Sequence, residues 1–174
     1  MRNKDVIRIV LAAMLITMVY VATYIGIPLP SAAGGYMHFG TVVLLVIAMR
    51  FGKYYGAMAG GIGMALFDIL SAYTAWAPGT FVVRFTMGYV IGWIAQDNNL
   101  GQGGNLIKNL IGWFFGLVIM IIGYYLYEAI FLTTFTAALA SIPGNLVQFG
   151  IGLAAPFIAY GMKDIKQIDE LLQG

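Results

Sequence analysis

Cysteine is absent from this 174-residue chain, histidine occurs once, and charged side chains make up only 9% of it. Without cysteine, the chain can form no disulfide, thiolate metal site or cysteine nucleophile. A single histidine leaves no multi-histidine metal site and makes a conventional catalytic triad hard to assemble, so we expect no metal site and no catalytic residue. The net charge is only +2 with no basic run, which argues against nucleic acid as a partner.

Apolar side chains are present in large excess. Hydrophobic residues form 61% of the chain, and its mean hydropathy is +0.88. A soluble domain is about 45–50% apolar and about 25% charged, so this chain has too few polar side chains to cover a water-soluble fold. We therefore predict an all-α integral membrane protein with a single membrane domain over residues 1–174.

Six apolar segments predict a bundle of six transmembrane helices. They cover about residues 6–27, 39–51, 54–75, 80–95, 106–131 and 142–161. Prolines mark the boundaries: Pro28 ends the first segment, Pro78 turns the chain into the fourth, and Pro143 suits the first turn of the sixth. The first segment is interpreted as a retained helix, because no clean cleavage site precedes Pro28. Residues 163–174 are predicted to form a solvated cytoplasmic helix or a frayed end.

Lysine and arginine positions orient the predicted bundle. With six spans and a cytoplasmic N-terminus, eight of the nine basic residues fall on the cytoplasmic side and none falls in an outer loop. The ninth, Arg84, lies within a helix. This bias predicts that both termini are cytoplasmic.

The third segment carries small residues at helical spacing, namely Gly56, Ala59, Gly60 and Gly63. Such spacing is typical of close helix packing. The cluster lacks the Gly-Lys-Ser/Thr ending of a phosphate loop, so we expect no ATP site of that kind in this chain.

Three ionisable residues, Asp68, Arg84 and Glu128, lie within predicted spans. A charge near the membrane centre costs about 2.5–3.5 kcal/mol on insertion scales. Asp68 lies near the outer end of the third segment and Arg84 near the outer start of the fourth, so their charges lie at matching depth and can pair. A purely structural pair and a ligand-contacting pair both remain open.

Amides lie at the same predicted depth. Glu128 is near the outer end of the fifth segment, while Asn145 and Gln148 are three residues apart on one face of the sixth. Together with Asp68 and Arg84, five polar side chains from four helices gather in the outer third of the membrane. This convergence predicts a ligand site.

Aromatic side chains lie in the outer loops above these polar groups. Tyr36 and His38 close the first loop, and Trp76 lies in the connection between the third and fourth segments. Such a lining suits a small, flat, polar heterocycle, although His38 alone is more typical of a satisfied interfacial histidine. Other aromatics, such as Tyr124 and Phe114, are interpreted as lipid-facing or packing residues.

Several stretches of the chain resemble the S components of energy-coupling factor (ECF) vitamin transporters. They are Gly34–Gly40, Phe51–Gly61, Asp68 followed by Trp76–Thr80, Arg84, and Pro143–Gln148. The likeness covers about three quarters of the chain. Within the family, the chain is most similar to the riboflavin-type group, including the hydroxymethylpyrimidine and pyridoxine carriers.

The resemblance implies a subunit that is not an enzyme and that captures a small water-soluble vitamin at an outward-facing site. Its partners would be a T component and two ATP-binding subunits in a bacterial plasma membrane. This chain would hold no cofactor, ATP and Mg would be bound by those partners, and ATP hydrolysis there would drive its reorientation. Docking to the T component is expected on the first helix at Ala12, Ala13 and Thr17, which depart from the family's Ala-xxx-Ala pattern.

The resemblance also suggests roles for the gathered side chains. Asp68 and Arg84 would form the floor of the vitamin site. Ring substituents would be hydrogen-bonded by Glu128, Asn145 and Gln148, and the ring would be stacked on or covered by Tyr36, His38 and Trp76. The identity of the vitamin does not follow from these residue types.

The main alternative is a stand-alone secondary carrier coupled to protons. In that case Asp68 and Glu128 would act as relay groups, and this chain alone would catalyse uptake driven by a pH gradient. No inverted repeat is visible in the sequence, and 174 residues are few for such a carrier.

Overall fold

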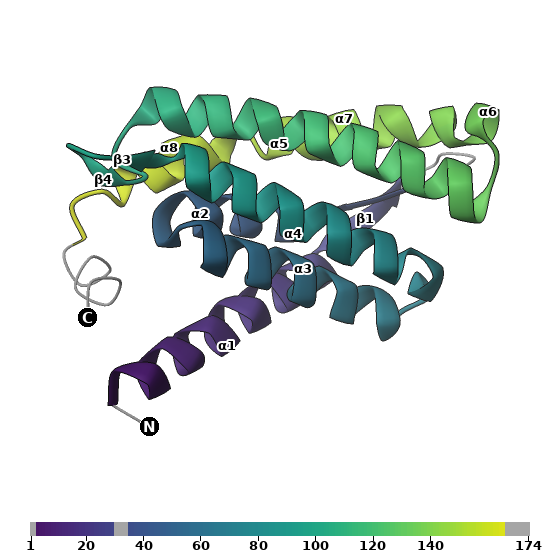
Figure 1. The fold of residues 1–174 in the computed structure, drawn as a ribbon. Coiled ribbons are helices and arrows are strands. Elements are labelled where there is room, and N and C mark those ends of the chain that lie inside the picture. The colour runs from purple at the N-terminus through teal and green to yellow at the C-terminus, as the bar shows by residue number, and fades with distance from the viewer. Residues whose placement is uncertain (1–2, 30–34, 166–174) are drawn as a thin grey trace.

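A computed structural model describes residues 3–29 and 35–165, and its architecture is mostly helical (Figure 1). Five long helices are α1 (Asn3–Tyr24), α2 (Gly40–Phe51), α3 (Lys53–Ile69), α4 (Ala77–Ile94) and α5 (Leu106–Tyr127). The sixth helical body consists of three consecutive helices, α6 (Phe135–Ala138), α7 (Ile142–Ile151) and α8 (Ala154–Gly161). Two short antiparallel hairpins pair β1 (Gly26–Leu29) with β2 (Gly35–His38), and β3 (Gln96–Asp97) with β4 (Gly101–Gln102).

The helices pack around α3 and α4. Helix α3 contacts α1, α2 and α4, and α4 also contacts α5. Figure 1 shows α5 running beside the α6–α7–α8 body, with α3 and α4 beneath them and α1 at the far side. The core is built mainly of aliphatic and methionine side chains, with Leu44, Met87, Ile91, Met120 and Phe149 at its centre.

Small residues allow α3 to approach its neighbours closely, as predicted. A Cβ atom added at Gly56 would lie 2.6 Å from the Ala48 Cα atom of α2. One added at Gly63 would lie 2.8 Å from the Ile16 carbonyl oxygen of α1. Larger side chains at these positions would therefore push helix backbones apart.

Three helical stretches are long and apolar enough to cross a membrane: Asp5–Tyr24, Leu106–Leu132 and Phe135–Gly161. Helix α2 is apolar but has only 12 residues, and 12 residues of α-helix span about 18 Å against a hydrocarbon core of about 30 Å. The chain is thus a helical protein with membrane-crossing helices. The count of six spans and the cytoplasmic position of both termini stay predictions.

The first predicted loop is instead a β-hairpin. Helix α1 ends at Tyr24, earlier than the predicted Ile27, and the chain then enters β1. Strand β1 pairs with β2 so that Gly26 lies opposite His38 and Pro28 lies opposite Tyr36. This pairing satisfies the backbone groups of a segment whose composition indicated only a loop.

The connection between α3 and α4 also differs from the prediction. Helix α3 ends at Ile69, six residues before the predicted end, and a 3₁₀ turn (Thr74–Trp76) leads directly into α4. Pro78 lies in the first turn of α4 rather than before it. A proline is tolerated there because the first helical N–H groups have no partner within the helix.

The last helical body is interrupted where one continuous helix was predicted. Helix α7 begins at Ile142, with Pro143 in its first turn, and a turn at residues 152–153 separates it from α8. Pro156 lies four residues after Gly152 and has no N–H to donate to the Gly152 carbonyl, which explains the break. Most of the predicted C-terminal tail, residues 166–174, lies outside the described part of the chain.

Candidate ligand-binding pocket

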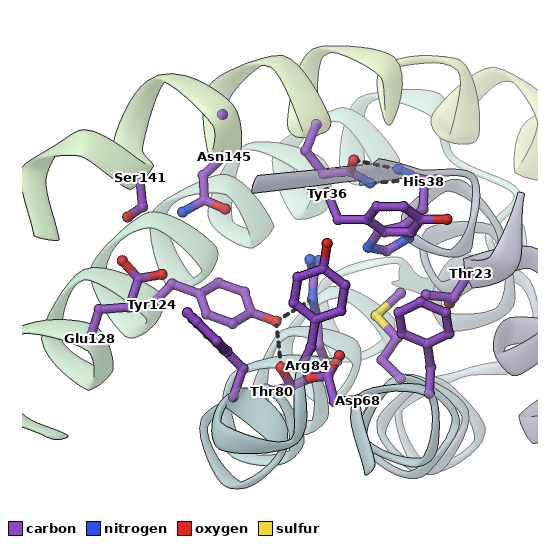
Figure 2. Close-up of a pocket in the computed structure, with 16 residues that line it drawn as sticks. Thr23, Tyr36, His38, Asp68, Thr80, Arg84, Tyr124, Glu128, Ser141 and Asn145 are labelled. Atoms are coloured by element: carbon purple, nitrogen blue, oxygen red, sulfur yellow. Dashed lines mark hydrogen bonds between the residues drawn. The ribbon is translucent and has the colours of Figure 1, made fainter. Parts of the chain in front are cut away.

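One pocket lies between the β1–β2 hairpin and helices α1, α3, α4, α5 and α7 (Figure 2). All eight predicted site residues line it: Tyr36, His38, Asp68, Trp76, Arg84, Glu128, Asn145 and Gln148. The lining also includes Thr23, Met64, Phe67, Tyr73, Thr80, Tyr124, Ser141 and Gly144. Tertiary packing therefore brings the whole predicted set to one hollow, while a role in binding a ligand stays a prediction.

Arg84 of α4 forms the centre of the floor and is only 3% exposed. Its Nε donates to the Tyr124 hydroxyl at 3.1 Å, and its Nη1 donates to the sulfur atoms of Met120 at 3.2 Å and Met87 at 3.6 Å. Thioether sulfur is a weak acceptor, and a guanidinium keeps its proton in proteins. The structure thus buries a permanent cation among neutral and weak acceptors.

Asp68 of α3 faces the same pocket as Arg84, and the two side chains, which their matching depth allowed to pair, make no direct ion pair. Among the described residues, no Asp68 oxygen lies within 4.0 Å of a guanidinium nitrogen. The guanidinium Nε is taken by Tyr124, whose hydroxyl in turn donates to Thr80 at 3.2 Å. Thr80 also hydrogen-bonds the Asp68 carboxyl group, and Arg84 lies close enough to interact with it electrostatically. The two charges are therefore linked through hydroxyls rather than in contact.

Glu128 lies at the other end of the pocket, where α5 ends in a π-helical turn (Glu128–Leu132). Its carboxylate faces the Trp76 indole and the Ser141 hydroxyl, both neutral. The Ser141 hydroxyl donates to the Ala138 carbonyl at 2.9 Å. Figure 2 shows Glu128, Ser141 and Asn145 together on one side of the pocket, with Arg84 near its centre.

The two predicted amides of α7 are used differently. Gln148 is 3% exposed, and its Oε1 accepts from the His38 backbone N–H at 2.9 Å. Its Nε2 donates to the His38 carbonyl and to the Thr41 hydroxyl, each at 2.7 Å. Asn145, in contrast, makes no hydrogen bond through its amide to any described residue. The Gln148 amide thus holds strand β2, and its contact with a ligand stays a prediction.

Aromatic rings line the hairpin side of the pocket. Tyr36 stacks on Phe67 with ring centres 5.6 Å apart and planes at 17°, and it also stacks on His38 at 5.7 Å. Tyr73 and Trp76 continue this surface with an edge contact at 6.1 Å. Tyr36 lies across the pocket from Glu128 and Asn145 (Figure 2), whereas Trp76 reaches Glu128.

His38 is a neutral member of the pocket. Burial, with a smaller effect of the Arg84 guanidinium, lowers the pKa of the His38 imidazole to about 3. Its Nδ1 atom is buried without a hydrogen-bond partner among the described residues, near Thr23 and Gly40. The imidazole therefore contributes no charge to the pocket near neutral pH.

Tyr124 and Thr80 are pocket residues that the sequence interpretation missed; Tyr124, expected to face lipid or to pack, packs in the core and also lines the pocket. Tyr124 is 8% exposed and bonds both Arg84 and Thr80. A usable signal existed in α5, where Asn109, Gly112, Gly116, Met120 and Tyr124 recur every three or four residues and form its buried face. That stripe of small and polar residues marks the inward side of the helix.

The predicted docking residues lie on α1, away from the pocket. Ala13 and Thr17 are exposed, Ala12 is partly buried, and the Thr17 hydroxyl donates to the Ala13 carbonyl at 2.8 Å. Ala13 and Thr17 are one turn apart, so they share a face of α1 that the described chain leaves uncovered.

Two comparisons bear on this architecture. A family model described as "ECF-type riboflavin transporter, S component" matches residues 3–162. A protein of Pyrococcus woesei, named "Uncharacterized protein in gap 3'region", is 36% identical over 98 residues. The match covers 56% of this chain and 62% of that protein, so it spans less than two thirds of the relative's length.

Proposed function

The chain belongs to the family of ECF-type riboflavin transporter S components, which are transporter subunits and not enzymes, and we propose that it captures a small water-soluble vitamin or vitamin precursor in the pocket of Figure 2. The observation that carries this proposal is the state of Arg84. A cation that is 3% exposed and bonded to one hydroxyl and two sulfur atoms lacks a strong acceptor. Buried charges are usually paired, so a ligand carbonyl or ring nitrogen would complete its coordination.

Three further features support a ligand in this place. Asn145 offers both an amide donor and an acceptor that no described residue uses. Glu128 and Asp68 supply acceptors at two other points of the lining. Aromatic faces on the hairpin side, chiefly Tyr36 and Phe67, suit a flat ring.

Transport would then depend on partners. The proposed assembly contains a T component and two ATP-binding subunits, which would hold the ATP and Mg, while this chain would hold no cofactor. Docking would use the α1 face with Ala12, Ala13 and Thr17, and the six helical bodies would span the cell membrane with both termini in the cytoplasm. The proposed ligands are the hydroxymethylpyrimidine and pyridoxine type of vitamin.

The test combines ligand identification with one variant. We expect mass spectrometry of the protein purified in mild detergent to reveal a co-purified vitamin, and Arg84→Met to lose it. Methionine keeps an apolar side chain of similar length beside Met87 and Met120, so folding should be preserved. Arg8→Met, at an exposed position of α1, is the matched control and should retain the ligand. Unchanged binding by Arg84→Met in calorimetry would contradict the proposal.

A stand-alone proton-coupled carrier is the second candidate, because Asp68 and Glu128 both line the pocket. It predicts that the purified chain alone, in proteoliposomes, accumulates the co-purified vitamin when a pH gradient is applied. The ECF proposal predicts no accumulation until the partner subunits and ATP are added.

A further inference from the structure

The size of the pocket limits what it can enclose. Its enclosed volume is about 100 Å³. Drug-sized ligand pockets begin near about 300 Å³, so this enclosure fits one substituted ring.

The charges in the pocket are unequal. Its described lining contains two carboxylates, Asp68 and Glu128, against the single guanidinium of Arg84. His38 is neutral, because burial lowers its pKa. The lining therefore offers two acidic side chains and one basic side chain to a ligand.

Glu128 is the carboxyl group that lies away from Arg84, whereas Asp68 lies close to it (Figure 2). Among the described residues, Glu128 faces the neutral groups of Trp76 and Ser141, and the Ser141 hydroxyl donates to the Ala138 carbonyl. A buried carboxylate without a cationic partner favours a ligand that brings one.

The polar and aromatic groups are separated across the hollow. Figure 2 shows Glu128 and Asn145 on one side, Tyr36 and His38 on the other, and Arg84 between them. A ring packed against the aromatic side of the pocket at Tyr36 would thus direct one substituent toward Arg84 and another toward Glu128. The first substituent must accept a hydrogen bond and the second must donate one.

We infer that the pocket selects a single aromatic ring that carries a protonated amine, with the amine held by Glu128 and Asn145 and an acceptor atom of the ring held by Arg84. This inference rests on the proposed function and names the class of its substrate. It excludes a three-ring flavin and a carboxylated ring as preferred ligands.

The experiment measures binding of four probes to the detergent-purified chain, emptied of co-purified ligand, by calorimetry near neutral pH. Pyridoxamine and pyridoxine form the matched pair, because they differ only in an aminomethyl group in place of a hydroxymethyl group. Nicotinate tests a single anionic ring, and riboflavin tests three fused rings. We expect pyridoxamine to bind about tenfold or more tightly than pyridoxine, as a charge-assisted hydrogen bond implies, and both to bind more tightly than nicotinate or riboflavin.

The Glu128→Gln variant tests whether the Glu128 carboxylate causes the preference for an amine. Glutamine keeps the shape of the side chain and removes its charge. The affinities for pyridoxamine and pyridoxine should therefore differ by no more than about twofold. Asp5→Asn, an exposed position of α1, is the control and should leave the ratio of the two affinities unchanged.

Three results would overturn the inference: riboflavin as the tightest ligand, an amine preference that survives in Glu128→Gln, or no binding by either member of the pair. None of these removes the proposed function, which is judged separately by the co-purified vitamin and its loss in Arg84→Met. Loss of the proposed function would instead appear as a purified chain that carries no vitamin and gains none.

Discussion

Asn145 and Gln148 share one face of α7, and only their partners distinguish them. Gln148 bonds three groups of residues more than 100 positions away in the sequence, at His38 and Thr41. Asn145 bonds no described residue and faces the pocket. One amide therefore fixes the hairpin that covers the pocket, and the other is available to a ligand.

Substitution of the two amides should separate stability from binding. Gln148→Ala removes three buried hydrogen bonds and leaves their partners unsatisfied, so we expect it to cost about 1–3 kcal/mol of stability. Asn145→Ala should leave the unfolding temperature in detergent unchanged but weaken ligand binding about fivefold, the value of one hydrogen bond. Thermal unfolding and calorimetry on both variants check this. Equal loss of unfolding temperature in the two variants would show that Asn145 is structural.

At the scale of elements, the two hairpins have different anchors. The β1–β2 hairpin is held to α7 through Gln148, beside the pocket. The β3–β4 hairpin is held to the opposite ends of the helices, where the Gln102 amide donates to the carbonyls of Met49 and Gly92. Arg50, 1% exposed at the end of α2, donates to the carbonyls of Gln102 and Met162. These bonds join α2, α4, β4 and the end of α8 at the side away from the ligand.

The loop of the β3–β4 hairpin is organised by Asp97. Its Oδ1 accepts from the backbone N–H groups of Leu100 at 3.0 Å and Asn99 at 2.9 Å, and its Oδ2 contacts Asn105 at 3.0 Å and Lys108 at 3.1 Å. The backbone bonds first, then Asn105 and Lys108, hold the pKa of Asp97 well below its usual range. The ionised carboxylate is therefore part of the folded hairpin.

The lowered pKa of Asp97 determines how the stability that it contributes depends on pH. Because the pKa is lower in the folded state, the stabilisation is complete above the unfolded value of about 3.9 and is lost as the pH falls below it. We expect Asp97→Asn to lower the unfolding temperature at neutral pH, with a difference from the unsubstituted protein that narrows as the pH falls from about 4 toward the lowered pKa of the folded state. Asp5→Asn should show no such narrowing. A difference that stayed constant with pH would mean that the Asp97 charge is unimportant.

At the scale of the whole molecule, the pocket and the Arg50–Gln102 bonds lie toward opposite ends of the helices. The pocket lies near the starts of α4 and α7, whereas Arg50 lies at the end of α2. The positive-inside distribution predicts that the pocket end faces outward and the Arg50 end faces the cytoplasm.

The absence of cysteine makes this orientation simple to test, because any single cysteine is the only thiol in the chain. Thr136→Cys lies in α6 at the pocket end and Asn99→Cys in the β3–β4 hairpin, and both positions are exposed. In intact cells, a membrane-impermeant maleimide should label Thr136→Cys, and it should label Asn99→Cys only after permeabilisation. Labelling with the reverse pattern would invert the proposed topology and place the pocket on the cytoplasmic side.

The sequence alone determined the membrane character of this protein and which polar side chains lie within its apolar segments. Hydropathy and helical period are local properties, so they were sufficient to predict helical segments and to bring Asp68, Arg84 and Glu128 to a similar depth. The β1–β2 hairpin was not predicted, because its strands are short and their composition is that of a loop.

The tertiary structure alone decided which polar groups remain available in the pocket. Arg84 meets Tyr124 instead of Asp68, and Gln148 is used by His38 while Asn145 is not. Each of these outcomes depends on how a helix is rotated about its axis and on contacts between residues 40 to 110 positions apart. Sequence spacing specifies the depth of a side chain along its own helix, but the partner it meets is set only when the helices pack against one another.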